Sequence, residues 1–307
     1  MQDATFSHIL FWQHPLSSLC FFCYAMSLLS LWAKKTPWLW GSFLTVAYAL
    51  AIQANIATAV SIIPILLLLL CHYLLKREIH SAGRLFLFAL ATTLSSLLFF
   101  HLLPGFHNWK IVNALQISAS AFPTTLWLNF DKPLIGLIPL ALSIPLIESR
   151  AQMRSAAKIA IPLTALGIFI LLGASLSLRV VAWDPKIPTI FFPWFFNNLI
   201  FVAIPEEAFF RGFFQKEVGK WLGKGTWARV GALIATSVLF TLFHVKWAID
   251  PSMLSIVFLS SILYGLIYEV TESIEASIFC HFLLNLVHFL FFTYPALSNS
   301  IIAGTIR

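Results

Sequence analysis

The sequence predicts an all-α, polytopic transmembrane helical bundle of about ten spans. Of its 307 residues, 60% are hydrophobic and 10% are charged, whereas soluble proteins carry about 25% charged residues. A mean hydropathy of +0.89 and a succession of apolar runs of membrane-spanning length point the same way. A water-soluble globule is therefore excluded. We expect an integral, multi-pass protein in contact with membrane lipids, located in the inner (plasma) membrane if the source is bacterial.

Ten apolar segments are expected to cross the membrane. They cover residues 16–33, 38–52, 56–75, 85–103, 133–147, 159–178, 189–210, 230–246, 253–268 and 276–293. The stretch 111–130 is interrupted by polar residues and proline, and we expect it to be re-entrant or to lie on the membrane surface. With both chain ends outside, 12 Lys and Arg residues fall on the inner side and 6 on the outer side, which is the bias of the positive-inside rule.

The net charge of +7 is carried mainly by short loops between the apolar runs. In a soluble protein this balance would suggest a nucleic-acid partner. Here the basic residues serve as orientation signals at the inner ends of the spans. We therefore expect no nucleic-acid partner.

A pair of glutamates interrupts the seventh predicted span. Glu206 and Glu207 lie among phenylalanines, and Arg211 follows Glu207 by four residues. A charge at the bilayer centre costs about 2.5 to 3.5 kcal/mol even on the lenient insertion scale. On a helix Glu207 and Arg211 share a face and can pair, while Glu206 is turned about 100° away. We expect Glu207 to be structural and Glu206 to be available as a base, although a buried ion pair that only fixes the helix ends is the alternative.

Two later spans carry histidine among apolar neighbours. The eighth contains Phe240 and His244 in the spacing FxxxH, and the tenth contains His281 and Asn285 in the spacing HxxxN. Residues i and i+4 of a helix lie on one face, so His281 and Asn285 can direct two donors at one point. Phe240 is expected to pack. A hydrogen-bonded pair that holds the bundle together is the alternative reading of His281 and Asn285.

Helix geometry places these groups at similar depths. At 1.5 Å per residue, Glu207 lies about 21 Å from the inner end of its helix and His244 about 24 Å along the next one. His281 and Asn285 lie about 9 to 15 Å into the tenth span. Carboxylates, histidines, an asparagine and an arginine provide a base, a proton partner and oxyanion donors, which suit the addition of water to a carbonyl. We expect one cluster that catalyses hydrolysis.

The motifs EExxxR at 206–211, FxxxH at 240–244 and HxxxN at 281–285 occur in this order on three predicted spans. In this arrangement the C-terminal third of the chain resembles the CPBP family, which comprises CAAX proteases and bacteriocin-processing enzymes and is also called the Abi or Rce1-like family. The resemblance divides the chain into three parts. They are an N-terminal transmembrane region of unassigned role (1–188), a four-span catalytic core (189–293) and a short tail (294–307).

The resemblance implies a glutamate-dependent intramembrane endopeptidase that acts on a peptide or a membrane protein. Glu206 would activate water together with His244. His281 and Asn285 would form the oxyanion hole. These four residues are therefore the expected catalytic residues.

In the same resemblance, Glu207 and Arg211 would support the site by holding its shape. Proteins of this family have also been described as metalloproteases, and zinc bound by Glu206, His244 and His281 is the alternative to a metal-free site. We favour no metal cofactor, because the sequence has no HExxH motif and the cluster contains no aspartate.

Two other classes of function compete with a protease. A proton-coupled transporter would also need buried Glu and His residues, but the first half of the chain has no counterpart of the charged cluster. A non-proteolytic membrane scaffold or immunity protein is the other alternative, against which the complete motif set argues. The GxSG and GxGD motifs of serine and aspartyl intramembrane proteases are absent from the sequence.

Overall fold

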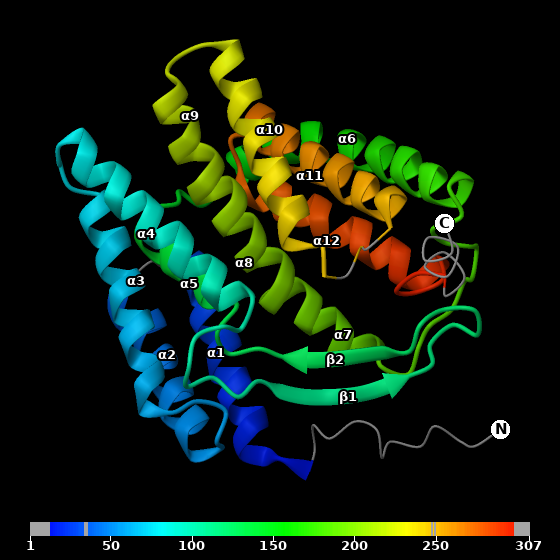
Figure 1. The fold of residues 1–307 in the computed structure, drawn as a ribbon, viewed down its shortest axis with the longest axis horizontal. Helices are drawn as coiled ribbons and strands as arrows, with labels where there is room; N and C mark the ends of the chain where they lie inside the picture. The colour runs from blue at the N-terminus through cyan, green and yellow to red at the C-terminus, as the bar shows by residue number, and fades with distance from the viewer. Residues whose placement is uncertain (1–12, 34–35, 247, 249, 298–307) are drawn as a thin grey trace. The chain divides into compact units, whose positions relative to one another are not determined.

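The computed structural model describes residues 13–33, 36–246, 248 and 250–297 (Figure 1). The chain divides into two compact units. The first comprises Met1–Val112, Leu126–Leu146 and Ile200–Phe213, and the second comprises Asn113–Thr125, Ile147–Leu199 and Phe214–Arg307. Of the predicted C-terminal tail, residues 298–307 lie outside the described part of the chain.

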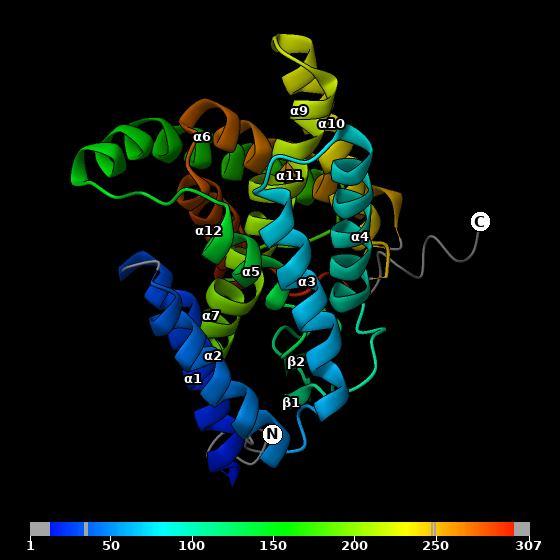
Figure 2. The same ribbon diagram turned by 90° about the vertical axis from the view of Figure 1, so that its left-hand side faces the viewer.

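The first unit consists of helices in neighbouring pairs. They are α1 (Pro15–Ala33), α2 (Pro37–Gln53), a 3₁₀ turn (Ala59–Ser61), α3 (Ile62–Leu75), α4 (Ser81–Phe99), α5 (Leu134–Leu142) and α8 (Ile204–Glu207). Helix α1 lies beside α2, and α3 lies beside α4, in both views (Figures 1 and 2). The short helix α5 packs against α3, α4 and α8. Helix α5 is the element that brings a distant part of the chain to the glutamate pair.

The second unit is a bundle of four long helices with two shorter ones. They are α6 (Arg150–Ser177), α7 (Phe191–Phe196), α9 (Lys216–Leu222), α10 (Thr226–Phe243), α11 (Pro251–Thr271) and α12 (Ile274–Phe291). Helix α11 contacts α6, α10 and α12. Side-chain caps define the helix starts: Ser149 and Gln152 form a capping box at α6, Asp250 caps α11, and Ser273 caps α12. These caps satisfy N–H groups that have no partner within the helix.

The stretch 111–130 contains strands. Strands β1 (Trp109–Leu115) and β2 (Thr124–Leu128) form a two-stranded sheet in which they run in opposite directions (Figure 1). Residues along β2 alternate strictly between buried and exposed, which is the period of a strand and not of a helix. The prediction that the chain is all helical is therefore wrong for this segment, although the rest of the described fold is mostly helical.

The seventh predicted span is an irregular helix. The turns on either side of α8 are π-helical, over Asn197–Ala203 and Ala208–Gln215. Helical structure continues through α9 to Leu222 and ends at Gly223, which has a φ of 100°. Glycine suits this end because it adopts positive φ without a steric cost. The helical stretch that contains the glutamate pair therefore ends at this glycine.

Six helices in the described residues are long and apolar enough to cross a membrane: α1, α4, α6, α10, α11 and α12. Ala59–Leu75 is a shorter apolar helical segment. In the two shortest predicted spans, 38–52 and 133–147, the structure has α2 with 17 residues and α5 with 9. A span needs about 20 residues in helical form, so α5 is too short to cross alone. The count of ten spans remains a prediction.

Helices α5 and α8 meet backbone to backbone. A Cβ atom on Gly136 of α5 would lie 2.2 Å from Cα of Pro205 and 2.6 Å from its carbonyl oxygen. No side chain can enter such a gap, so glycine is needed for the close approach. Pro205 directly precedes Glu206. The contact therefore holds the backbone of the glutamate pair close to α5.

We expect the substitution Gly136→Ala to destabilise the protein by about 1 to 3 kcal/mol, because the backbone of α8 must move away from the added methyl group. The measurement is the unfolding midpoint in detergent. Gly41→Ala is the matched control, since a Cβ at Gly41 of α2 meets nothing within 4 Å. Equal midpoints for both variants would contradict the close approach.

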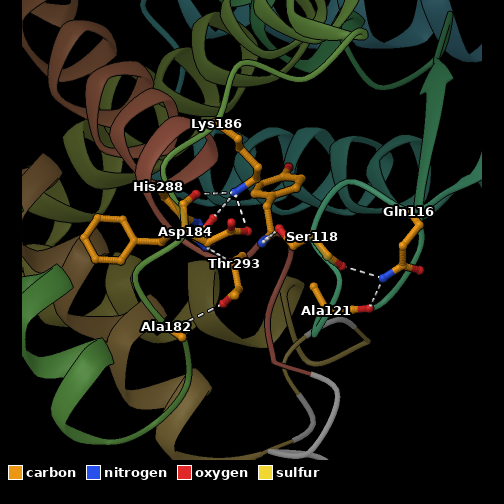
Figure 3. A network of polar contacts seen from close by, with 10 residues as sticks. Gln116, Ser118, Ala121, Ala182, Asp184, Lys186, His288 and Thr293 are labelled. Carbon is orange, nitrogen blue, oxygen red and sulfur yellow. Dashed lines mark hydrogen bonds and ion pairs between the residues drawn. The ribbon is translucent and has the colours of Figure 1, made fainter. Parts of the chain in front are cut away.

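A polar network in the second unit ties the segment before α7 to the end of α12 (Figure 3). The Lys186 ammonium contacts the Asp184 carboxylate at 3.1 Å and the carbonyl of Phe292, and the hydroxyl of Thr293 accepts a hydrogen bond from the Ala182 N–H at 2.9 Å. Burial acts to raise the pKa of Asp184, but hydrogen bonds from Ser118 and Lys186 and the lysine charge outweigh it, so this pKa is lowered. The network fixes the chain segment that leads into α7.

Candidate active site

The glutamate pair lies in the first unit on a short piece of α-helix. Glu206 and Glu207 belong to α8, and π-helical turns precede and follow it. Such turns are rare and occur frequently at functional sites, because the extra residue in each turn disturbs the regular hydrogen bonding of the backbone. The pair is almost fully buried, with 1% of Glu206 and none of Glu207 exposed.

Glu207 pairs with Arg211, as its spacing predicts. The distance between Glu207 Oε1 and Arg211 Nη1 is 3.1 Å, and both side chains are completely buried. A buried charge is tolerated when an opposite charge compensates it. The geometry therefore supports a structural part for this pair.

Glu206 also has an ion-pair partner, which the sequence did not reveal. Its Oε1 lies 2.5 Å from Nζ of Lys132, a lysine that precedes α5. Lys132 lies directly before a predicted span, yet only 7% of it is exposed. Helix spacing predicts only that Glu206 does not share the face of Arg211, and a residue far away in sequence supplies its charged partner.

Several contacts hold the segment that carries Lys132. The Phe130 N–H donates to Oδ1 of Asn108 at 3.0 Å, and the Tyr24 hydroxyl donates to the Phe130 carbonyl at 3.1 Å. The Lys132 N–H donates to Oδ1 of Asp131 at 2.8 Å. The Lys132 ammonium lies 4.4 Å from the centre of the Phe99 ring, a distance suited to a cation–π contact. Lys132 is therefore directed at Glu206 from a fixed backbone.

Asp131 extends this polar group to a histidine. The carboxylate is 1% exposed and lies 2.8 Å from Nδ1 of His101. His101 has a φ of 59° in the left-handed region, an uncommon conformation for a residue other than glycine. No motif connects His101 with the glutamate pair, since the link depends on the turn that precedes α5.

His244 lies in the second unit at the end of α10. Its Nδ1 is 2.7 Å from the carbonyl of Phe240, and the two rings stack at 4.3 Å. A carbonyl oxygen only accepts hydrogen bonds, so Nδ1 carries the proton in this geometry, and in a neutral ring Nε2 is the basic nitrogen. Phe240 packs, as expected, and its carbonyl also selects the histidine tautomer.

His281 of α12 joins the same aromatic group. The Phe240 ring centre lies 6.1 Å from that of His281, and Tyr264 of α11 stacks on His281 at 4.6 Å with the planes 12° apart. His281 and Tyr264 are 4% and 2% exposed. Helices α10, α11 and α12 thus bring both predicted histidines to one ring, that of Phe240.

Asn285, one turn after His281, contacts the segment that follows α7. Its amide nitrogen donates to Oδ1 of Asn198 at 3.3 Å. This interhelical hydrogen bond uses one of the two amide N–H groups. It also fixes which end of the Asn285 side chain carries the donors. Asn198 is therefore a residue that orients a candidate oxyanion donor.

Within each unit, the described residues contain no group of three or more His, Cys, Asp or Glu side chains that could hold a metal ion. Glu206, the first of the three alternative zinc ligands, belongs to the first unit. The other two, His244 and His281, belong to the second.

Residues 188–287 match the family model described as "Type II CAAX prenyl endopeptidase Rce1-like". This part of the chain is an Rce1-like domain. Comparison with curated proteins and with solved structures gave no match. The Rce1-like family is a peptidase family, and together with the six apolar helices it shows that the chain is an integral membrane protein.

The four predicted catalytic residues and the two supporting ones all lie within the Rce1-like domain. Lys132, Asp131 and His101 lie outside it. One signal could have pointed to Lys132: Asp131 and Lys132 are charged residues placed directly before the apolar run of 133–147. Tyr264 lies within the domain, but a single tyrosine in an apolar run gave no signal.

Proposed function

We propose that the chain is an intramembrane endopeptidase that hydrolyses a peptide bond of a peptide or membrane protein with a water activated by glutamate and histidine. The observation that carries the proposal is the Rce1-like match over residues 188–287, which includes every motif residue from Glu206 to Asn285. The CPBP core of four spans, residues 189–293, and a bundle of ten spans are parts of this proposal.

In the proposed reaction, the Glu206 carboxylate accepts a proton from water while the water oxygen attacks the carbonyl carbon of the scissile bond. His244 acts with Glu206 and passes the proton released by the water to the leaving amine nitrogen as the C–N bond of the peptide breaks. Its geometry supports this part, because the Phe240 carbonyl holds Nδ1 as the protonated nitrogen and makes Nε2 the nitrogen that exchanges protons.

His281 and Asn285 donate hydrogen bonds to the oxygen that becomes negative when water adds to the carbonyl. Two features support this assignment. Stacking on Tyr264 fixes the plane of the His281 ring, and the bond to Asn198 orients the Asn285 amide. Preorganised donors stabilise a developing charge without having to reorient during the reaction. No metal takes part in this proposal.

The test is a comparison of membrane peptidomes from cells that carry the wild-type protein or the Glu206→Ala variant. We expect a set of membrane-derived peptides to be present only in the wild-type sample, and their longer precursors to accumulate in the variant. Immunoblotting of the membrane fraction controls for equal amounts of the two proteins. An unchanged peptide pool across growth conditions would contradict a protease and favour a scaffold or a transporter.

A further inference from the structure

The contact between Lys132 and Glu206 joins two parts of the chain that no motif connects. Both side chains are buried, the atoms are 2.5 Å apart, and Lys132 lies outside the Rce1-like domain. In the first unit the candidate base is therefore held by a cation that the N-terminal region supplies.

An ionised carboxylate in an apolar interior is costly unless a positive charge compensates it, and without such a charge it takes up a proton. A protonated carboxyl group cannot accept a proton from water. The arginine that follows α8 contacts the other glutamate, since Arg211 Nη1 lies 3.1 Å from Glu207 Oε1. The ammonium of Lys132 contacts Glu206 directly.

We propose that Lys132 is a positioning residue for the reaction, which keeps the Glu206 carboxylate ionised and in one orientation. This inference rests on the proposed function, since it assigns the part that Lys132 takes at the same site. It also gives the N-terminal region, residues 1–188, a defined part in catalysis.

The backbone around Lys132 is built for this contact. Gly136 allows α5 to touch α8 at Pro205, and the turn before α5 is held by Asn108 and Tyr24. The Phe99 ring accepts the same ammonium on its face. These contacts fix the backbone from which the Lys132 side chain reaches Glu206.

The other charged or titratable groups on these segments are Glu207 and Arg211 on the helix of Glu206, and Asp131 beside Lys132 with its partner His101. Glu207 and Arg211 compensate each other, and Asp131 contacts His101. Removal of Lys132 therefore takes away a cation that is in direct contact with the Glu206 carboxylate.

The first test reads the protonation of Glu206 directly and needs no substrate. Infrared difference spectra are recorded for Glu206→Gln against its parent, in the wild-type background and in the Lys132→Met background, with the purified full chain in lipid vesicles at neutral pH. We expect Glu206→Gln to remove a carboxylate band in the wild-type background and a protonated carboxyl band in the Lys132→Met background. A carboxylate band in both backgrounds would overturn the proposal.

The second test is the dependence of kcat on pH, measured with a peptide identified in the peptidome comparison. In Lys132→Met the acid limb of the profile should move to higher pH by about 1 to 3 pH units, so kcat at pH 7 falls about tenfold or more while KM changes little. Lys132→Arg should restore most of the rate. Lys110→Met, which removes a lysine that lies over the Trp127 ring, should behave as the wild type.

The outcomes separate the two proposals. A lower unfolding midpoint in Lys132→Met with an unchanged pH profile would show that Lys132 is structural only, and would leave the proposed function intact. Full cleavage by Glu206→Ala would contradict the proposed function itself, whereas the infrared result would still report the ionisation of Glu206.

Discussion

Replacing His244 with alanine is expected to lower kcat by about 10²- to 10⁴-fold, the usual contribution of a positioned proton-transfer group. The Phe240 carbonyl holds this imidazole in a single tautomer, and alanine provides no group that exchanges protons. The measurement is cleavage of the identified peptide by purified protein in lipid vesicles, with kcat and KM determined separately.

His107→Ala is the matched control, because it removes an imidazole that is exposed in the first unit. We expect His107→Ala to cleave at the wild-type rate. The unfolding midpoint of His244→Ala should stay close to that of the wild type, since this residue is only half-buried and follows the last residue of α10. Cleavage by His244→Ala within a factor of about three of the wild-type rate would be too fast for a loss of acid–base catalysis, and the assignment would fail.

Replacing Arg211 with methionine should lower the free energy of unfolding by about 3 to 5 kcal/mol, because it leaves the Glu207 carboxylate without its compensating charge in the interior. The pair is completely buried and its atoms lie 3.1 Å apart. The measurement is the denaturant dependence of unfolding in detergent. Arg229→Met, at an exposed position near the start of α10, is expected to leave stability unchanged.

Arg211→Met can lose stability because the attraction between the two charges is gone or because the Glu207 charge is left uncompensated. The double variant Glu207→Gln/Arg211→Met distinguishes these two causes. Once the glutamate is neutral, most of the lost stability should return, because replacing both members of a buried pair is often close to neutral. If the double variant is as unstable as Arg211→Met alone, packing around the guanidinium, and not charge, carries the stability.

Local features of this chain follow from its sequence because they depend on residues within one or two turns. The pairing of Glu207 with Arg211 follows from a spacing of four on a helix, and the end of α9 follows from glycine at a positive φ. The meeting of His244 and His281 required one more assumption, that adjacent spans pack side by side. The histidines reach a common aromatic group because α10, α11 and α12 are consecutive helices.

Features that depend on distant residues could not be predicted in this way. Lys132 reaches Glu206 because α5 is a short helix that approaches α8 at Gly136, and hydrophobicity alone suggested a membrane span at this place. Strand β2 was missed for a related reason. Its five residues fall in a moderately apolar stretch, and a window of helical length averages out an alternation of period two.

The close approach of Gly136 and Pro205 limits how far α5 and α8 can move relative to each other. Where main chain touches main chain, no rotatable bond lies in the contact, so thermal motion of side chains cannot widen it. Helix α8, which carries Glu206, is then held against α5, which follows Lys132, by backbone atoms alone. Only the rotamers of the two charged side chains remain to be ordered, and their ion pair limits that freedom before any substrate arrives.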